Sequence, residues 1–385
     1  MNHKELLFGF LRSVVCGGQV TEEMKNACTE ETLAQVYKLA AHHDLAHLVG
    51  QAVSKLPIAE SEAAKKCKNA AMVAFYRYTQ IRYEYQRICD LLEAEKIPFI
   101  PLKGSVLRDY YPEPWMRTSC DIDILVTPEI LEQAAKALVE QLGYDRKGKG
   151  DHDISLYAAT GVHLELHYCA VDEGRMPQAQ KVLAGIWEDA TPAPGKQYHK
   201  CMSDEMFYFY HIAHMAKHFD NGGCGVRPFL DIWILENRVA HDPQKREALL
   251  TAGGMAQFAR AAQRLTDVWF GRGEMDPLSE KLEKFILDGG VYGTVKGLVA
   301  VRQTKKGSKL RYAASRIFLS YRDLKYQYPI LQKHKWLMPV FQVVRWCKLL
   351  FCGGVKRSLH EMQVNAVMSP EEIGTTDELI KYLGL

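Results

Sequence analysis

The spacing of apolar residues changes twice along the chain and so divides it into three parts. In residues 1–96 apolar positions recur with helical spacing, and acidic residues stand near the expected helix starts. The last helix of this part is expected to end at Ile97-Pro98, because the residue before a proline disfavours helical geometry. Residues 97–170 show short apolar runs and alternation, which are typical of strands. Helical spacing returns from Ser203 onward.

The middle part is predicted to contain strands, turns and one helix. Its segments are, in order, a strand ending in a glycine turn at 97–104, a helical turn at 106–111, a strand at 120–126, a helix at 127–144 and a hairpin at 153–171. We expect Thr127 to cap the helix at its start and Gly143 to end it. Residues 175–200 are expected to be irregular, because "TPAPGK" interrupts any regular pattern.

These elements predict an α+β fold in which helical regions precede and follow a small mixed sheet. The expected division is an N-terminal helical region at 1–96, an α/β module at 97–200 and a C-terminal helical region at 201–385 with a basic segment at 302–357. Ser203 is expected to cap the first helix of the C-terminal region.

The composition indicates a globular protein, with 47% hydrophobic and 25% charged residues and a net charge of +3. Its cysteines form no C-x-x-C pair, which argues against a zinc ribbon or a thioredoxin-like site. The start of the chain is a poor export signal, so we expect reduced thiols and a cytoplasmic protein. Pro339, Arg345 and Lys348 interrupt the apolar stretch 336–354. That interruption argues against a transmembrane helix and leaves a helix on a membrane surface as an alternative.

Two aspartates lie one residue apart in the apolar run "CDIDILV". Because strand residues two apart face the same side, Asp121 and Asp123 project together, while Ile122 and Ile124 face the core. Two close carboxylates repel each other unless a cation offsets them, and Mg²⁺ takes such hard oxygen ligands together with substrate phosphates. The alternatives are an exposed acidic face or pairing with Arg117.

A third carboxylate is expected beside this pair. In "GVHLELH" the alternation places His163, Glu165 and His167 on one face and apolar residues on the other. If this strand lies beside the aspartate strand, Glu165 completes a cluster able to hold two divalent ions. Two such ions clamp the attacking and leaving oxygens of a phosphoryl-type transfer.

Residues upstream of the aspartates suit phosphate binding. Lys103, Gly104 and Ser105 fall where a predicted strand gives way to a helical turn, and backbone N–H groups at such a turn bind phosphate oxygens. A plain strand-to-helix turn is the alternative. Arg117 precedes the aspartates and offers a guanidinium to a triphosphate.

The segment "IPFIPLKGSVLRDYYPEPWMRTSCDIDILV" resembles the signature of a bacterial nucleotidyltransferase family within the polymerase-beta-like superfamily. The matching positions are Leu102, Lys103, Gly104, Tyr111, Pro112, Arg117, Asp121 and Asp123. "LELH" resembles the family's next element, and "HMAKHF" and "RPFLDIWILE" resemble its later helical motifs. These elements supply Glu165, His167, His214, His218, Arg227 and Asp231. In the wider superfamily the Gly-Ser turn lies closer to the aspartates, so "RDYYPEPWM" is expected to form an extra turn.

The resemblance implies a metal-dependent nucleotidyltransferase that transfers NMP from an NTP to a hydroxyl of a small molecule, an RNA or a protein. It assigns catalysis and the binding of Mg²⁺ or Mn²⁺ to Asp121, Asp123 and Glu165. It assigns substrate binding to Lys103, Gly104, Ser105, Arg117, His167, His214, His218 and Arg227. The first alternative is a nucleotide- or RNA-binding protein built on such a module without turnover. The second is a helical interaction protein with an incidental D-x-D.

Three further features each allow more than one interpretation. His211, His214 and His218 form a stripe on a predicted helix, which is either a nucleotide- or metal-binding patch or a packing stripe. Arg227 and Asp231 lie four residues apart on a helix and either pair with each other or contact the substrate. Segment 302–357 is rich in basic and aromatic residues. It suits nucleic acid or an anionic membrane surface, or else forms solvated helix faces.

Overall fold

The computed structural model describes residues 1–54, 56–150, 152–170, 176–291, 293–351 and 355–385. The last residue of the predicted hairpin, Val171, and residues 352–354 of the basic segment lie outside the described residues.

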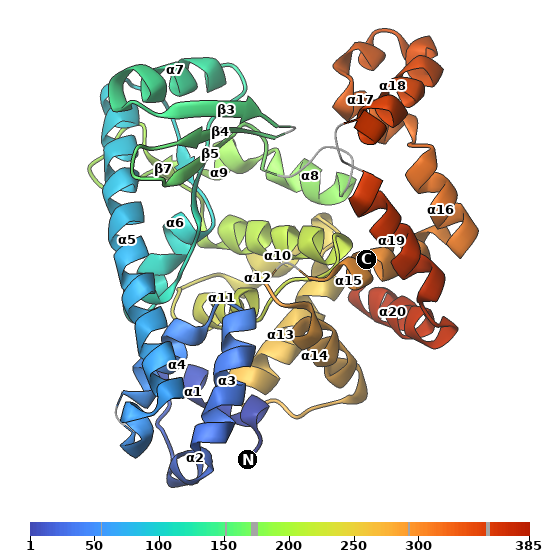
Figure 1. Cartoon of the computed structure of the whole chain (residues 1–385). Coiled ribbons are helices and arrows are strands. Elements are labelled where there is room, and N and C mark those ends of the chain that lie inside the picture. Colours follow the sequence, from blue (N-terminus) through green and yellow to red (C-terminus); the bar gives the residue numbers. More distant parts are fainter. Residues whose placement is uncertain (55, 151, 171–175, 292, 352–354) are drawn as a thin grey trace.

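The N-terminal part is helical, as the apolar spacing predicts. It comprises α1 (His3–Val15), α2 (Glu22–Ala27), α3 (Glu30–His42), α4 (Ala46–Val53), the 3-10 turn η1 (Pro57–Glu60) and α5 (Glu62–Ala94). Ser61 caps α5 by accepting a hydrogen bond from the amide of Ala64. Figure 1 shows α5 running the length of the molecule, from the other N-terminal helices at its start to the sheet at its end.

The five-stranded sheet has the order β1-β2-β5-β4-β3, which confirms the predicted α+β fold. Its strands are β1 (Ile100–Pro101), β2 (Asp121–Leu125), β3 (Asp145–Lys149), β4 (Asp153–Tyr157) and β5 (His163–His167). Strands β2 and β5 are parallel, and every other pair is antiparallel. The predicted hairpin is β4–β5. Apolar side chains of β2 and β5 pack against α5 and α7 (Leu131–Leu142) on one face of the sheet.

Around this sheet one local prediction is wrong, and one strand was not predicted. Thr127 does not cap α7, which begins at Leu131 after a turn closed by the Ile130 amide and the Thr127 carbonyl. Gly143 does end α7, with a φ of 72° that suits glycine. Strand β3 was not predicted, because its sequence "DRKGK" is polar throughout, as an edge strand open to water allows.

The segment predicted to be irregular is largely ordered. Its described residues form α8 (Pro177–Leu183), α9 (Ile186–Asp189) and the short strand pair β6 (Thr191–Pro192) and β7 (Lys200–Cys201). The pairing of β6 with β7 closes the "TPAPGK" turn, so that turn joins two strands. The sequence pattern does not reveal these strands, because a strand of two residues carries no periodic signal.

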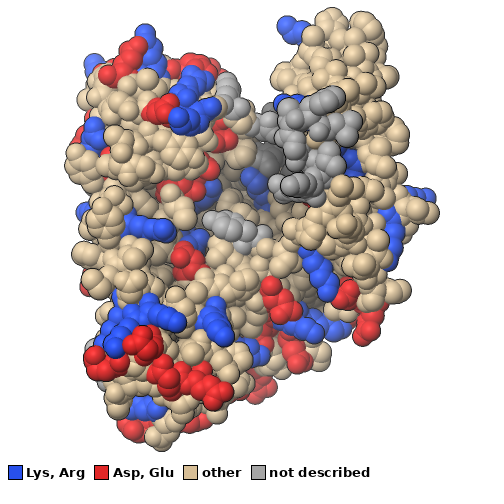
Figure 2. All heavy atoms as spheres, viewed as in Figure 1, with Lys and Arg blue, Asp and Glu red and all other residues tan. Residues whose placement is uncertain are grey.

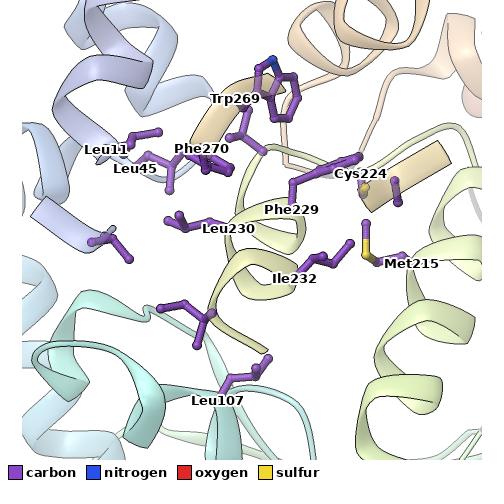
Figure 3. Close-up of a cluster of buried hydrophobic side chains, with 14 of the residues drawn as sticks. Leu11, Leu45, Leu107, Met215, Cys224, Phe229, Leu230, Ile232, Trp269 and Phe270 are labelled. Atoms are coloured by element: carbon purple, nitrogen blue, oxygen red, sulfur yellow. The ribbon is translucent and has the colours of Figure 1, made fainter. Parts of the chain in front are cut away.

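The helices after the sheet share a core with the N-terminal helices. They are α10 (Asp204–Asp220), α11 (Arg227–Asn237), α12 (Pro243–Ala252), α13 (Ala256–Phe270), α14 (Pro277–Gly289) and, near the end of the chain, α20 (Pro370–Leu383). Ser203 caps α10, as predicted. Figure 3 shows Leu11 and Leu45 of the N-terminal region near Leu230 of α11 and Phe270 of α13. The domain boundaries at 96 and 200 stay a prediction.

The buried side chains of the remaining helices form small clusters outside this core. They are α15 (Val295–Lys306), α16 (Lys309–Ile317), α17 (Tyr321–Gln327), the turns η4 (Pro329–Gln332) and η5 (Lys335–Leu337), α18 (Met338–Phe351) and α19 (Val355–Val367). Helices α17 and α18 lie at the upper right of Figure 1, beyond α16, and have a small core of their own. In the part of the chain that the structure describes, no helix is long and apolar enough to cross a membrane.

Candidate active site

The three predicted carboxylates meet on one face of the sheet. The parallel register of β2 and β5 places Asp121 opposite His163 and Asp123 opposite Glu165. Because side chains alternate along each strand, the acidic face points away from the core that Ile122 and Ile124 enter. Ligand atoms of Asp123, Glu165 and His167 lie within 4.8 Å of one another, and so do those of Asp121, His163 and Glu165. This acidic face is therefore a candidate metal site.

Lys103 reaches this cluster from the turn after β1. Its Nζ lies 2.6 Å from Oδ1 of Asp123 and 3.8 Å from Oε2 of Glu165. The backbone of Lys103 has φ 47° and ψ −123°, a left-handed conformation that costs free energy for a residue with a side chain. The amide of Leu102 donates to the carbonyl of Asp123 and ties the turn to β2. A strained lysine held in this way directs its ammonium at the carboxylates.

His167 supports the same two carboxylates from behind. Its Nε2 lies 2.8 Å from Oδ1 of Asp123 and 3.3 Å from Oε2 of Glu165, and its ring stacks on that of His152. An imidazole nitrogen facing two carboxylate oxygens must carry a proton and donate it. His167 is 3% exposed. His167 therefore positions Asp123 and Glu165, and its ring exposes almost no surface that a substrate could contact.

The two aspartates have opposite electrostatic environments. Burial opposes ionisation of Asp123, but attraction by Lys103 and a hydrogen bond from His167 outweigh it and hold the pKa of Asp123 well below its usual range. Burial and the charge of Asp123 raise the pKa of Asp121. Among the ion pairs of the described residues, none involves Asp121. Asp121 therefore presents carboxylate oxygens whose charge an added cation would compensate.

Arg117 is already occupied by an acidic partner. Its Nε and Nη2 donate to the two carboxylate oxygens of Asp231 at 2.7 and 2.8 Å, and the hydroxyl of Tyr111 donates to the same carboxylate at 2.7 Å. The guanidinium lines the cavity described below, but its chief contact joins the extra turns η2 (Arg108–Tyr110) and η3 (Pro114–Met116) to α11. Arg117 thus pairs with neither Asp121 nor Asp123 within the described ion pairs.

Arg227 does not pair with Asp231, its neighbour on α11. Nη1 of Arg227 instead donates to Asp44 at 2.9 Å and to the Thr118 carbonyl at 3.2 Å. Asp231 has both oxygens taken up by Arg117. Arg227 therefore attaches Asp44 to α11, and Asp231 attaches Arg117 to it. Arg227 and Asp231 form no ion pair with each other.

The histidine stripe of α10 forms the wall opposite the carboxylates. His214 and His218 are in edge-to-face contact at 4.6 Å, and His211 bonds through Nε2 with the carbonyl of Pro228 at 3.0 Å. Burial and the nearby charge of Lys103 lower the pKa of His218 to about 4. Burial also lowers the pKa of His214 well below its usual value. The imidazoles of His214 and His218 are therefore neutral near pH 7.

A cavity of about 330 Å³ lies between these walls. Of the residues predicted for the site, Lys103, Gly104, Arg117, Asp121, Asp123, Glu165, His214, His218 and Arg227 line it, whereas His167 does not. Ser105 does not belong to that lining, and its buried Oγ has no partner among the described residues. A Cβ at position 104 would lie 3.1 Å from Cβ of Ser119, a tight contact, so glycine suits the close approach of this turn to Ser119.

Several lining residues were not predicted: His43, Ser119, Cys120, His152 and Lys217. Ser119 and Cys120 directly precede β2, so the strand itself was a usable signal for them. Lys217 directly precedes His218, the last residue of the histidine stripe, so the helical spacing of that stripe was a usable signal for it as well. His43 comes from α3 and its following turn, more than a hundred residues before α10 in the sequence, and no local pattern indicates its position.

Comparison with known proteins gives one match. The profile of a protein family described as uncharacterised nucleotidyltransferase matches residues 29–271, a range that contains every lining residue named above. No curated protein and no solved structure matches the chain.

Proposed function

The chain belongs to the uncharacterised nucleotidyltransferase family, and from this premise we propose that it is a metal-dependent enzyme that transfers NMP from an NTP to a hydroxyl acceptor. The observation that carries the proposal is the meeting of Asp121, Asp123 and Glu165 on adjacent parallel strands at the wall of a cavity. Clustered carboxylates facing a basic turn suit a metal-bound triphosphate.

The donor set of this site fits Mg²⁺ or Mn²⁺. Asp121, Asp123 and Glu165 offer hard oxygen ligands, and the charge of Asp121 lacks a compensating ion pair among the described residues. When bound, the ion would neutralise charge on the carboxylates and on the phosphates of the NTP. His167 keeps Asp123 and Glu165 oriented toward such an ion through its shared Nε2–H.

The residues of the chain divide the remaining tasks. Lys103 and the backbone at Gly104 hold the triphosphate, with Arg227 adding positive charge from the far wall. The neutral imidazoles of His214 and His218 hydrogen-bond the nucleoside. The acceptor oxygen attacks the α-phosphorus, the bond to pyrophosphate breaks, and Glu165 takes the acceptor's proton unless it serves as a ligand. Arg117 acts mainly by holding the cavity wall in place.

One observation favours a non-catalytic nucleotide- or RNA-binding protein as the second candidate. Lys103 and His167 already compensate Asp123 and Glu165 within the protein, so that part of the cluster needs no metal. Under this alternative, an NTP would bind with equal affinity in the presence and absence of Mg²⁺. Under the enzymatic proposal, Mg²⁺ strengthens NTP binding.

The deciding experiment incubates the protein with each α-labelled NTP, Mg²⁺ or Mn²⁺ and a cell extract whose small molecules, RNA and proteins are then separated. We expect wild type to transfer label to one of these fractions. The rate of transfer by Asp123→Asn should be at least about 100-fold lower. Asp145→Asn, which changes an exposed aspartate of β3, is the matched control and should transfer label normally. Equal labelling by wild type and Asp123→Asn, or no labelling and no metal-dependent NTP binding, would refute the proposal.

A further inference from the structure

Helix α18 exposes an apolar stripe that nothing in the described chain covers. Trp336 in η5 and Val340, Val343, Val344 and Cys347 in α18 recur at the spacing of one helix face. Trp336 is 75% exposed, Val340 53% and Val343 52%. We call these five residues the valine face. Single exposed apolar residues are ordinary on a protein surface, but a continuous stripe along three helical turns indicates a contact surface.

The orientation of α18 is fixed by contacts on its opposite side. Gln342 donates to the carbonyl of Leu319 at 2.6 Å, and Arg345 donates to the carbonyls of Ile317 and Arg316 at 3.1 and 3.0 Å. The ring of Phe341 packs on Tyr328 at 4.7 Å. Rotating the helix to bury the valine face would break these hydrogen bonds. These contacts therefore keep the valine face on the solvent-exposed side of α18.

The surroundings of the valine face are positively charged. Lys333 and Lys335 precede Trp336, Lys348 follows Cys347, and all three are exposed. Between Leu324 and His360 the sequence contains no Asp or Glu. In Figure 2 the visible surface at the upper right, where Figure 1 places α17 and α18, is mainly uncharged. The apolar stripe can insert into an apolar phase, and the lysines beside it attract anions.

We propose that the valine face docks the protein onto the surface of an anionic lipid bilayer. Such a helix lies in the plane of the interface, with its apolar side among the acyl chains and its lysines at the headgroups. Trp336 stands at the end of the stripe, and tryptophan favours the headgroup boundary because its ring is apolar and its N–H is polar. The inference concerns a surface remote from the carboxylate cluster and does not depend on the proposed function.

Other occupants fit the charges and the exposed side chains less well. A second copy of the chain would bring the rims of Lys333, Lys335 and Lys348 against their own equivalents, and like charges repel. Nucleic acid would satisfy the lysines but leave the valines in contact with phosphates and water. An anionic bilayer complements both the stripe and its rim.

The test is flotation of the full-length protein with vesicles. One set contains phosphatidylcholine alone and the other phosphatidylcholine mixed with phosphatidylglycerol. We expect flotation with the anionic vesicles at least about tenfold above that with neutral ones, and weaker flotation at high salt. The double variant Val343→Glu/Val344→Glu should lose this flotation. Lys333→Glu/Lys335→Glu should lose the preference for the anionic lipid.

The matched control is Val73→Glu, which places the same charge at an exposed valine of α5. It should float as wild type does. Thermal unfolding verifies that each variant is folded. The proposal is overturned if wild type does not float, or if Val343→Glu/Val344→Glu floats like wild type. It is also overturned if the only effect of Val343→Glu/Val344→Glu is a change from dimer to monomer in light scattering. Binding of single-stranded RNA without binding of vesicles would overturn it as well.

Discussion

At the scale of single residues, the ionised carboxylate of Asp121 destabilises the metal-free protein. Burial and the neighbouring Asp123 raise the pKa of Asp121, so its ionised form is disfavoured in the folded protein. At any pH above that raised pKa, the ionised carboxylate lowers the free energy of unfolding. Asp121→Asn removes the charge at nearly constant volume. We expect it to stabilise the metal-free protein at pH 7 by about 1 kcal/mol, measured by urea unfolding.

The same substitution should abolish stabilisation by metal. Mn²⁺ should raise the unfolding temperature of wild type and leave that of Asp121→Asn unchanged, because a ligand stabilises only the state that binds it. Asp145→Asn, on the exposed edge strand, serves as the control in both measurements. A metal-free Asp121→Asn protein less stable than wild type would contradict the electrostatic account.

Lys103 occupies oxygens that a metal would use. Its Nζ lies 2.6 Å from Asp123, so an incoming divalent ion meets both a repelling charge and a filled position. We expect Lys103→Met to bind Mn²⁺ alone about tenfold more tightly than wild type and to bind NTP more weakly, as measured by Mn²⁺ paramagnetic resonance and calorimetry. Lys147→Met, on exposed β3, should change neither affinity. Unchanged or weaker binding of Mn²⁺ to Lys103→Met would show that Lys103 does not compete for the carboxylates.

At the scale of elements, the Arg117–Asp231 pair holds the loop between β1 and β2 against α11. Both side chains are buried, and Tyr111 adds a third hydrogen bond. Because removing one partner leaves a buried charge unpaired, Asp231→Asn should lower the free energy of unfolding by about 3 kcal/mol. Urea unfolding measures the loss, and Asp44→Asn, whose partner Arg227 is less buried, should cost under about 1 kcal/mol. Similar losses for the two variants would contradict the assignment.

The elements also show which parts of the site the sequence could reveal. Alternation in "CDIDILV" and "GVHLELH" was enough to predict an acidic face, because a strand has only two sides. The spacing of Arg227 and Asp231 did not reveal their partners, since Arg117 and Asp44 come from other segments of the chain. The left-handed backbone of Lys103 is equally hidden, because local preferences favour glycine there. Long-range pairing and strain are properties of the packed molecule.

At the scale of the whole molecule, α5 connects two separate cores. Ala63, Ala64 and Cys67 near its start belong to the large helical core, while Ile81, Ile88 and Leu92 belong to the core of the sheet. Between them, Phe75 and Tyr76 are more than half exposed. The carboxylates lie on the sheet and the histidine wall lies on α10, which belongs to the other core. The continuity of α5 across both cores therefore helps to set the distance between the two walls of the cavity.

A proline in the middle of α5 tests this dependence. Tyr76→Pro removes one helical hydrogen bond and places its ring against the carbonyl four residues earlier, which costs about 3 kcal/mol and bends the helix. We expect calorimetry to resolve two unfolding transitions where wild type shows one, and NTP affinity to fall by at least about tenfold. Tyr76→Ala removes the same exposed side chain without bending α5 and should leave both properties near wild type. A Tyr76→Pro protein that unfolds in one transition and binds NTP normally would show that contacts other than α5 align the sheet with α10.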